Sequence, residues 1–413
     1  MNPPRKLPPP QLIDTLEEFE RFARSLKGVK RIAVDIESDG FYVYNEKICL
    51  VQFSTEKGDF IADPLAVKDF SPLGPLFRDP NVEKIFHAGE YDVLCLKRDF
   101  GFKIKNVFDT MIASRALGEP KLGLKTAIEK HFGAKLSKKL QRANWGKRPL
   151  TPEQIQYARL DTHYLLRLRD ILHGALEKKD LLHHVNDEFH RLERVEPSPR
   201  LFDPEGFWHL SGAKALTSQK RAVLRTVYLY REKKAAQLDR APFRILPEQL
   251  LVRIAEVCPK NQDALRKVKG MTPYLFRYYG QDLVREIAKG LSAAPIDKPP
   301  ERPPRTRWDG DTMRRYEALR EWRKKIAEER SVHPIVILAT EEVRALAQAP
   351  RNNSDAELWL ACLSEYRRKS YGLAIMEVLK QPQPTKRRRR RRRGKHGSGS
   401  GAGGESPQQP ANK

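Results

Sequence analysis

The sequence has few cysteines and no long hydrophobic run. Four cysteines occur in 413 residues, and none belongs to a Cys-x-x-Cys pair. This scarcity argues against a disulfide framework and against a cysteine-based zinc site, and it favours a reducing compartment. No segment is apolar for long enough to span a membrane, and the N-terminal residues lack the apolar core of a signal peptide. We therefore expect a cytoplasmic protein without a membrane partner.

Negative charge is scarce relative to positive charge. The chain carries 78 Lys and Arg against 53 Asp and Glu, which gives a formal net charge of +25. Residues 385–413 contain ten Lys or Arg and one Glu, so this segment contributes +9 and the rest of the chain keeps +16. An excess that is spread over the body of a protein predicts a polyanionic partner. The length itself predicts two to three domains.

The basic segment 385–413 is predicted to be disordered. It contains seven consecutive arginines and a Gly- and Ser-rich end, with almost nothing to bury. Such a run suits nonspecific attraction to RNA or contact with another RNA-bound protein. A nuclear import signal is the alternative interpretation.

Four carboxylates stand at the edges of apolar segments in the first 161 residues: Asp35, Glu37, Asp92 and Asp161. The alternation of Arg31–Ile36 predicts a strand, and residues two apart on a strand face the same side, as Asp35 and Glu37 would. Carboxylates that converge from separate elements suit a hard cation, because Mg²⁺ prefers oxygen ligands. Two such ions about 3.5–4 Å apart can hold a phosphodiester and activate a water molecule.

Tyr157 stands four residues before Asp161, so on a helix both side chains project from one face. The run from Pro152 to about Glu177 predicts a single helix with Thr151 as its N-cap. Each residue alone has a structural alternative, because an Asp after a strand is often a cap and a Tyr on such a helix usually packs in the core. The combined spacing favours nuclease chemistry. Four other acidic residues fit turn or cap roles better: Asp39, Asp63, Asp99 and Asp109.

The remaining pattern of the first half predicts an α/β fold with a central mixed sheet. Lys47–Ser54, Asp59–Ile61 and Lys84–His87 read as further strands, and Tyr91–Asp99 reads as a helix. Strands followed by helices mixed with short strands are typical of this class.

Five blocks of sequence resemble the ordered motifs of the ribonuclease D family: DIES, HAGEYDVLCLKRDFG, VFDTMIASRALG, QRANWGKRPLT and YARLDTHYLL. These enzymes are DEDD-type 3′-5′ exonucleases whose third motif carries Tyr-x-x-x-Asp. The resemblance covers about Leu12 to Leu182 and implies a ribonuclease H-like exonuclease domain over residues 1–200. It also implies that the four carboxylates bind two divalent ions, Mg²⁺ or Mn²⁺, and that Tyr157 orients the attacking water. The segment after the first motif, residues 38–40, is more polar than the family's aromatic-rich version.

The second half contains an internal repeat with a shift of 92 residues. The shift aligns Pro242 with Pro334, and the Tyr-Gly pair at 279–280 with that at 371–372. Each unit reads as several amphipathic helices, and a proline-rich stretch separates the two. The units resemble the helicase-and-RNase-D C-terminal (HRDC) domain. We expect two all-α HRDC-like domains at residues 210–292 and 304–381.

Basic and aromatic residues near these elements are candidate nucleic-acid contacts. A loop before the catalytic helix supplies Lys138, Lys139, Arg142, Trp145, Lys147 and Arg148, and the repeats supply Arg277, Arg367 and Arg368. The cations suit phosphates of an incoming strand, and the alternative is a solvated face. Trp145 suits either base stacking or anchoring of its loop.

The sequence as a whole predicts a metal-dependent 3′-5′ exoribonuclease that trims RNA ends, such as those of tRNA precursors, and releases nucleoside 5′-monophosphates. Two alternatives remain open. One is a 3′-5′ DNA exonuclease, because the choice between RNA and DNA depends on contacts to the 2′-hydroxyl, which no residue can be assigned. The other is a noncatalytic RNA-binding protein, against which the intact acidic set speaks.

Overall fold

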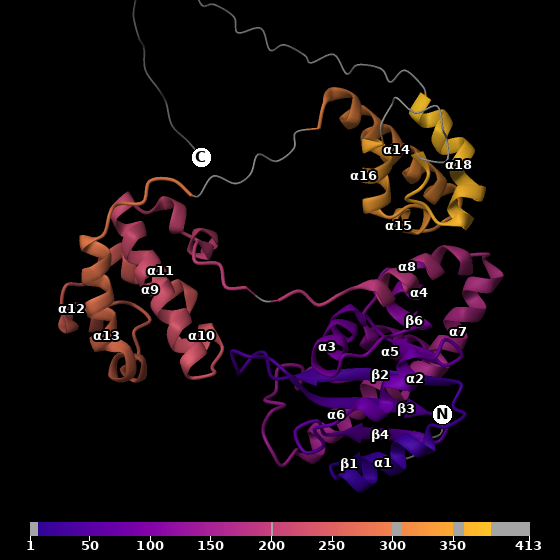
Figure 1. Cartoon of the computed structure of the whole chain (residues 1–413), viewed down its shortest axis with the longest axis horizontal. Coiled ribbons are helices and arrows are strands. Elements are labelled where there is room, and N and C mark those ends of the chain that lie inside the picture. The colour runs from indigo at the N-terminus through magenta and orange to yellow at the C-terminus, as the bar shows by residue number, and fades with distance from the viewer. Residues whose placement is uncertain (1–6, 200, 300–307, 350–358, 381–413) are drawn as a thin grey trace, which may run out of the picture.

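The computed structural model describes residues 7–199, 201–299, 308–349 and 359–380 (Figure 1). The basic segment 385–413, which was predicted to be disordered, lies outside these residues. An α/β domain is followed by two helical units. In the described part of the chain, no helix is both long enough and apolar enough to cross a membrane.

A six-stranded mixed sheet forms the centre of the α/β domain, as the sequence predicts. Its spatial order is β1-β4-β3-β2-β5-β6, with β3 antiparallel to β2 and β4, and the other neighbours parallel. The strands are β1 (Gln11–Ile13), β2 (Arg31–Ser38), β3 (Ile48–Thr55), β4 (Gly58–Ala62), β5 (Glu83–Phe86) and β6 (Val107–Asp109). The edge strands β1 and β6 are three residues long and were not predicted. Strand β2 lies inside the sheet, with β3 on one side and β5 on the other.

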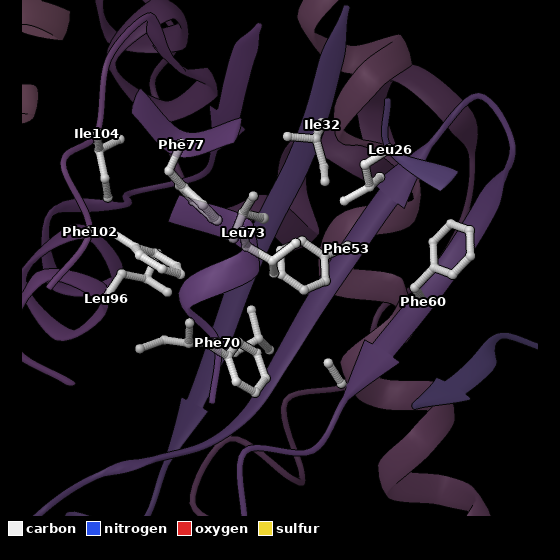
Figure 2. Packing of buried hydrophobic residues seen from close by; sticks show 14 of the residues in the cluster. Leu26, Ile32, Phe53, Phe60, Phe70, Leu73, Phe77, Leu96, Phe102 and Ile104 are labelled. Atoms are coloured by element: carbon white, nitrogen blue, oxygen red, sulfur yellow. The ribbon is translucent and has the colours of Figure 1, made fainter. Parts of the chain in front are cut away.

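Aromatic and aliphatic side chains fill the space between one face of the sheet and the helices that cover it (Figure 2). Phe53 on β3 and Phe60 on β4 contact the ring of Phe22, with centroids 5.2 and 4.8 Å apart. All eight residues of β3 are buried. Continuous burial explains why the first half of this strand, residues 48–51, is an unbroken apolar run instead of alternating.

Eight helices belong to the α/β domain in the described residues. They are α1 (Leu16–Ser25), α2 (Gly74–Arg78), α3 (Glu90–Phe100), α4 (Thr110–Ala116), α5 (Leu124–Phe132), α6 (Pro152–His163), α7 (Leu165–Lys178) and α8 (Leu182–Arg194). Helix α6 packs on β2, β3 and β4, whereas α7 packs on α4 and on β2, β3 and β5.

The prediction of one helix from Pro152 to Glu177 is wrong at its centre, because the helix ends at His163 and α7 begins at Leu165. The end of α6 is tied to β4: His163 Nδ1 lies 2.8 Å from an Asp59 carboxylate oxygen. We attribute the break to the different supports of the two segments, since α6 packs on β4 whereas α7 packs on α4 and β5.

The first helical unit contains α9 (Ser218–Gln237), α10 (Pro242–Ile245), α11 (Glu248–Val257), α12 (Gln262–Arg266) and α13 (Pro273–Ser292). It contacts the α/β domain at the loop between β2 and β3, residues 39–47. Tyr44 in this loop donates a 2.8 Å hydrogen bond to Glu232 and packs on the core of the unit. The Asn45 backbone N–H donates to Asp239 at 2.9 Å.

The second helical unit contains α14 (Gly310–Glu329), α15 (Pro334–Ile337), α16 (Thr340–Gln348) and α18 (Glu365–Lys380). It docks on α8 of the α/β domain (Figure 1). His184 Nε2 lies 2.8 Å from the Tyr371 hydroxyl, and Ser364 donates to Asp187 at 2.6 Å. The two repeats therefore contact different elements of the first domain.

Candidate active site

Strand β2 delivers the first two carboxylates to one side of the sheet. Asp35 and Glu37 alternate with Val34 and Ile36, which are buried in the core. The register with β3 shifts between Glu37 and Ser38, so a β-bulge follows the acidic pair. Bulges of this kind re-aim side chains at the end of a ladder and are common beside active sites.

Asp92 lies in the first turn of α3, and the turn before the helix fixes its position. The Gly89 N–H donates to Asp109 Oδ2 at 2.7 Å, and Asp109 also caps α4 by accepting from Met111 N at 2.8 Å. A Cβ at Gly89 would lie 2.5 Å from the Phe86 Cβ, so this close approach requires glycine. The cap role expected for Asp109 is thus confirmed.

Helix α6 carries Tyr157 and Asp161. Its start is fixed by the predicted N-cap Thr151, which forms a capping box with Gln154: Gln154 N donates to Thr151 Oγ1 at 3.2 Å, and Thr151 N donates back at 3.0 Å. Arg159 Nε donates to an Asp59 carboxylate oxygen at 2.6 Å, which anchors the middle of the helix to β4. The helix therefore has little freedom to rotate.

The carboxylates from these elements converge. Ligand atoms of Asp35, Glu37 and Asp161 all lie within 4.8 Å of one another. Asp92 is not part of this group of three, but burial raises its pKa well above the usual value, and the charges of Asp35, Asp109 and Asp161 raise it further. The structure therefore brings three of the four predicted carboxylates into one group, with Asp92 close enough to interact with them electrostatically.

Burial and mutual repulsion make these carboxyl groups hard to ionise. Burial raises the pKa of Asp35 to about 7. Burial, followed by the charges of Asp35, Asp161 and Asp92, raises the pKa of Glu37 to about 10. The pKa of Asp161 is also raised well above its usual value, first by burial and then by Asp35. A bound divalent cation would remove this penalty, and an oxygen-only donor set fits Mg²⁺ or Mn²⁺.

The Tyr157 hydroxyl group faces the same cluster. Burial and then the charges of Asp161 and Glu37 raise the pKa of Tyr157 far above its usual value, so the phenol keeps its proton. A neutral phenol is a hydrogen-bond donor and a poor base. Its ring packs on Trp145, with centroids 5.9 Å apart.

Known proteins share this arrangement of domains. Residues 10–177 match the model of a family described as 3′-5′ exonuclease, and residues 220–287 and 313–379 match the HRDC domain. Ribonuclease D of Desulfotalea psychrophila is 26% identical over 290 residues, which cover 70% of this chain and 77% of that protein. The crystal structure of the catalytic core of RRP6 from Trypanosoma brucei is 31% identical, has a TM-score of 0.63, and covers 68% of this chain and 80% of that chain.

The chain belongs to the ribonuclease D and RRP6 family of 3′-5′ exonucleases. The two helical units are its HRDC domains, as the repeat predicts. The exosome complex exonuclease RRP6 of Saccharomyces cerevisiae is 32% identical over 267 residues, or 61% of this chain and 36% of that protein. The chain thus spans about a third of the length of the exosome relatives that it matches.

Some residues that were predicted to contact nucleic acid lie in the interior of the protein instead. Trp145 is 1% exposed, so its indole has no open face for a base, and it supports Tyr157. Arg367 is 1% exposed and forms ion pairs with Glu342 at 2.7 Å and Asp187 at 3.2 Å. Both predictions are corrected, because a buried ring or cation has no contact with a strand outside.

Arg148 is half-buried and has a structural role. Its guanidinium donates to both carboxylate oxygens of Asp63, at 2.5 and 2.7 Å, and to the carbonyl of Cys49. This bidentate pair joins its loop to the end of β4. The remaining predicted cations are exposed: Lys138, Lys139, Arg142, Lys147, Arg277 and Arg368.

Sequence reasoning missed Glu46, which joins the two halves of the acidic site. Glu46 accepts hydrogen bonds from Ser38 Oγ at 2.8 Å and from the Tyr91 hydroxyl. Ser38 follows Glu37 in the chain, and Tyr91 precedes Asp92. No pattern in the sequence marks Glu46, because the contact depends on how the loop of residues 39–47 folds back.

Proposed function

We propose that the chain is a metal-dependent exoribonuclease that removes nucleotides one at a time from RNA 3′ ends. The observation that carries this proposal is the group of Asp35, Glu37 and Asp161 within 4.8 Å, beside Asp92 and Tyr157. The names of the relatives, ribonuclease D and RRP6, support RNA as the substrate. Ends of structured RNAs such as tRNA precursors are the proposed natural substrates.

The proposed cycle hydrolyses the terminal phosphodiester and releases a nucleoside 5′-monophosphate. Asp35, Glu37 and Asp161 would hold one divalent ion, and Asp35 with Asp92 would hold a second. Two such ions, when bound, supply Lewis-acid activation of water and stabilise the leaving oxygen. The Tyr157 hydroxyl group, which keeps its proton, donates a hydrogen bond that orients the attacking water. The 3′ oxygen of the shortened RNA leaves and takes up a proton.

A product ladder tests this function. The purified chain is incubated with 5′-labelled RNA and DNA oligonucleotides of one sequence, in Mg²⁺, in Mn²⁺ and with EDTA. We expect single-nucleotide shortening of RNA in the presence of either metal, and none with EDTA. A ladder on DNA alone would replace the proposal by a DNA exonuclease. Binding without any cleavage, in every metal condition, would identify a noncatalytic RNA-binding protein.

A further inference from the structure

A pocket of about 460 Å³ lies between the exonuclease domain and the first HRDC domain. The exonuclease domain contributes Lys47, Asn144 and Lys147 to its lining, and the HRDC domain contributes Arg240 and Arg244. Four of these five side chains are cationic. Neither domain alone would form this pocket.

Most of the positive charge in the pocket is free for a ligand. Among the lining residues the one carboxylate is Asp39, which is 2% exposed and binds Lys47, with 3.0 Å between Oδ2 and Nζ. Within the described residues, Lys147, Arg240 and Arg244 form no ion pair. Cations that line one pocket from two domains and have no acidic partner are the pattern expected for a phosphate site.

Aromatic neighbours hold the two arginines in place. The Arg244 guanidinium lies 3.9 Å from the centre of the Tyr42 ring, and its Nε donates to the Phe41 carbonyl at 2.6 Å. Arg240 donates from one terminal nitrogen to the Tyr274 hydroxyl at 3.1 Å. The other N–H groups of both side chains remain able to donate to phosphate oxygens. Because the guanidinium planes are already held in place, less conformational entropy is lost when a ligand binds.

The internal repeat offers a comparison within the molecule. Arg240 and Arg244 correspond to Val332 and Val336 of the second HRDC domain. There, Val336 is 4% exposed and packs into the hydrophobic cluster of the exonuclease domain. The same two positions of the fold therefore carry apolar residues in the second copy and, in the first, arginines that line a pocket, one of which also contacts the exonuclease loop. This contrast favours a polar, anionic ligand for the first copy.

Exposed rings continue the basic surface along α13. Tyr274 and Tyr278 are 47% and 59% exposed, and their ring centroids lie 4.7 Å apart. Arg277 is exposed on the same helix. In the second HRDC domain Tyr366, which corresponds to Tyr274, stacks on His183 of the exonuclease domain. Rings and cations side by side are typical of single-strand binding, in which bases stack and phosphates pair.

The pocket is close to the acidic site. Asp39 in its lining is two residues beyond Glu37, a separation of about 7 Å along an extended chain. Gly146, also in the lining, follows Trp145, which packs on Tyr157. A strand whose 3′ end lies among the carboxylates can therefore reach the pocket within a few nucleotides.

We propose that this pocket binds backbone phosphates of the RNA strand whose 3′ end is in the active site, with Tyr274 and Tyr278 stacking bases farther along. The proposal rests on the proposed exoribonuclease function and adds the path of the strand. It predicts a specific role for the first HRDC domain: it extends the substrate site beyond the nucleotides that are cleaved.

The test uses the full chain with Lys147→Ala and Arg240→Ala combined, since neither side chain supports a contact between the domains. The dissociation constant for a long single-stranded RNA is measured in EDTA at several salt concentrations. We expect roughly tenfold weaker binding. The slope of log K against log salt should also become shallower by about 1.4, because two phosphate contacts are lost at about 0.7 each. Turnover of a dinucleotide in Mg²⁺ should stay unchanged.

The matched control is Lys260→Ala combined with Arg344→Ala, which removes two exposed cations away from the pocket. It separates a local site from the loss of net charge. If RNA binding weakened equally in both double variants, or in neither, the proposal that the pocket binds RNA would be overturned. Loss of dinucleotide turnover in the Lys147 and Arg240 variant would also overturn it, because those residues would then act at the scissile bond. Failure of the parent to cleave RNA would contradict the proposed function alone, since binding is measured without turnover.

Discussion

The Trp145 indole packs against the Tyr157 ring, with centroids 5.9 Å apart, on the side of the helix that carries Asp161. Trp145 is buried, while the hydroxyl group of Tyr157 reaches the acidic cluster. The loop before α6 therefore supports the residue that we expect to orient the attacking water. The packing role of Trp145 and the water-orienting role of the Tyr157 hydroxyl group can therefore be tested by separate substitutions.

Replacing Tyr157 by Phe removes the hydroxyl group and keeps the ring on Trp145. We expect turnover to fall by about 10²-fold, because a group that positions a reacting water is lost. The thermal midpoint should change little. Steady-state rates on a short RNA, with melting curves, measure both quantities.

Trp145→Ala is the complement of that variant. It removes a fully buried ring, so the free energy of unfolding should fall by about 3–5 kcal/mol. The variant's unfolding in urea measures this loss. Wild-type stability for Trp145→Ala, or a wild-type rate for Tyr157→Phe, would contradict the assigned roles.

Asp35→Asn tests the acidic site with and without metal. We expect at least about a 10³-fold loss of hydrolysis, since a metal ligand contributes several kcal/mol to the transition state. RNA binding in EDTA should persist. Rates in Mg²⁺ and Mn²⁺, together with RNA titrations, check both expectations, and full activity in either metal would refute the ligand role.

The same variant should be more stable than the parent when metal is absent. Burial raises the pKa of Asp35 to about 7, so its contribution to stability is present below the unfolded value near 4 and is lost as pH rises through 7. Asn has no proton to lose. In urea unfolding at pH 8 in EDTA, Asp35→Asn should therefore have the higher free energy of unfolding. Adding Mg²⁺ should stabilise the parent more than the variant.

The position of the acidic residues was largely predictable, because alternation on a strand and four-residue spacing on a helix fix directions. Sequence spacing did place Asp35, Glu37 and Asp161 together. It did not reveal that Arg367 is buried, because its carboxylate partner Asp187 is 180 residues away and belongs to another domain. The burial of such a cation depends on docking, which local pattern does not encode.

Arg367→Ala should destabilise the second HRDC domain and its docking on α8. Removing the buried guanidinium leaves the half-buried carboxylates of Glu342 and Asp187 without their cation, at a cost of about 3–5 kcal/mol. Arg368→Ala is the control, because this neighbour is exposed. Hydrogen exchange in α8 and α18 reads out the docking. Equal hydrogen-exchange rates in the two variants would show that Arg367 does not stabilise the docking.

The docking should also weaken in acid through His184. Burial, and then the charges of Arg330 and Arg367, lower the pKa of His184 to about 4. A histidine with a lowered pKa adds stability above its unfolded pKa, near 6.5, and this stability is lost as pH falls towards 4. Exchange protection of α18 should therefore fall over this range. His184→Gln should flatten the response; an identical pH profile would refute the assignment.

The position of Arg367 in the second copy is occupied by Leu275 in the first, where the leucine is 8% exposed and belongs to the copy's own core. The two HRDC domains are consequently no longer interchangeable parts. Exchanging their order along the chain would bring a leucine to Asp187 on α8 and would leave an arginine without its exonuclease partner. The docking of the second HRDC domain on α8 therefore depends on an arginine that the first HRDC domain lacks at the same position.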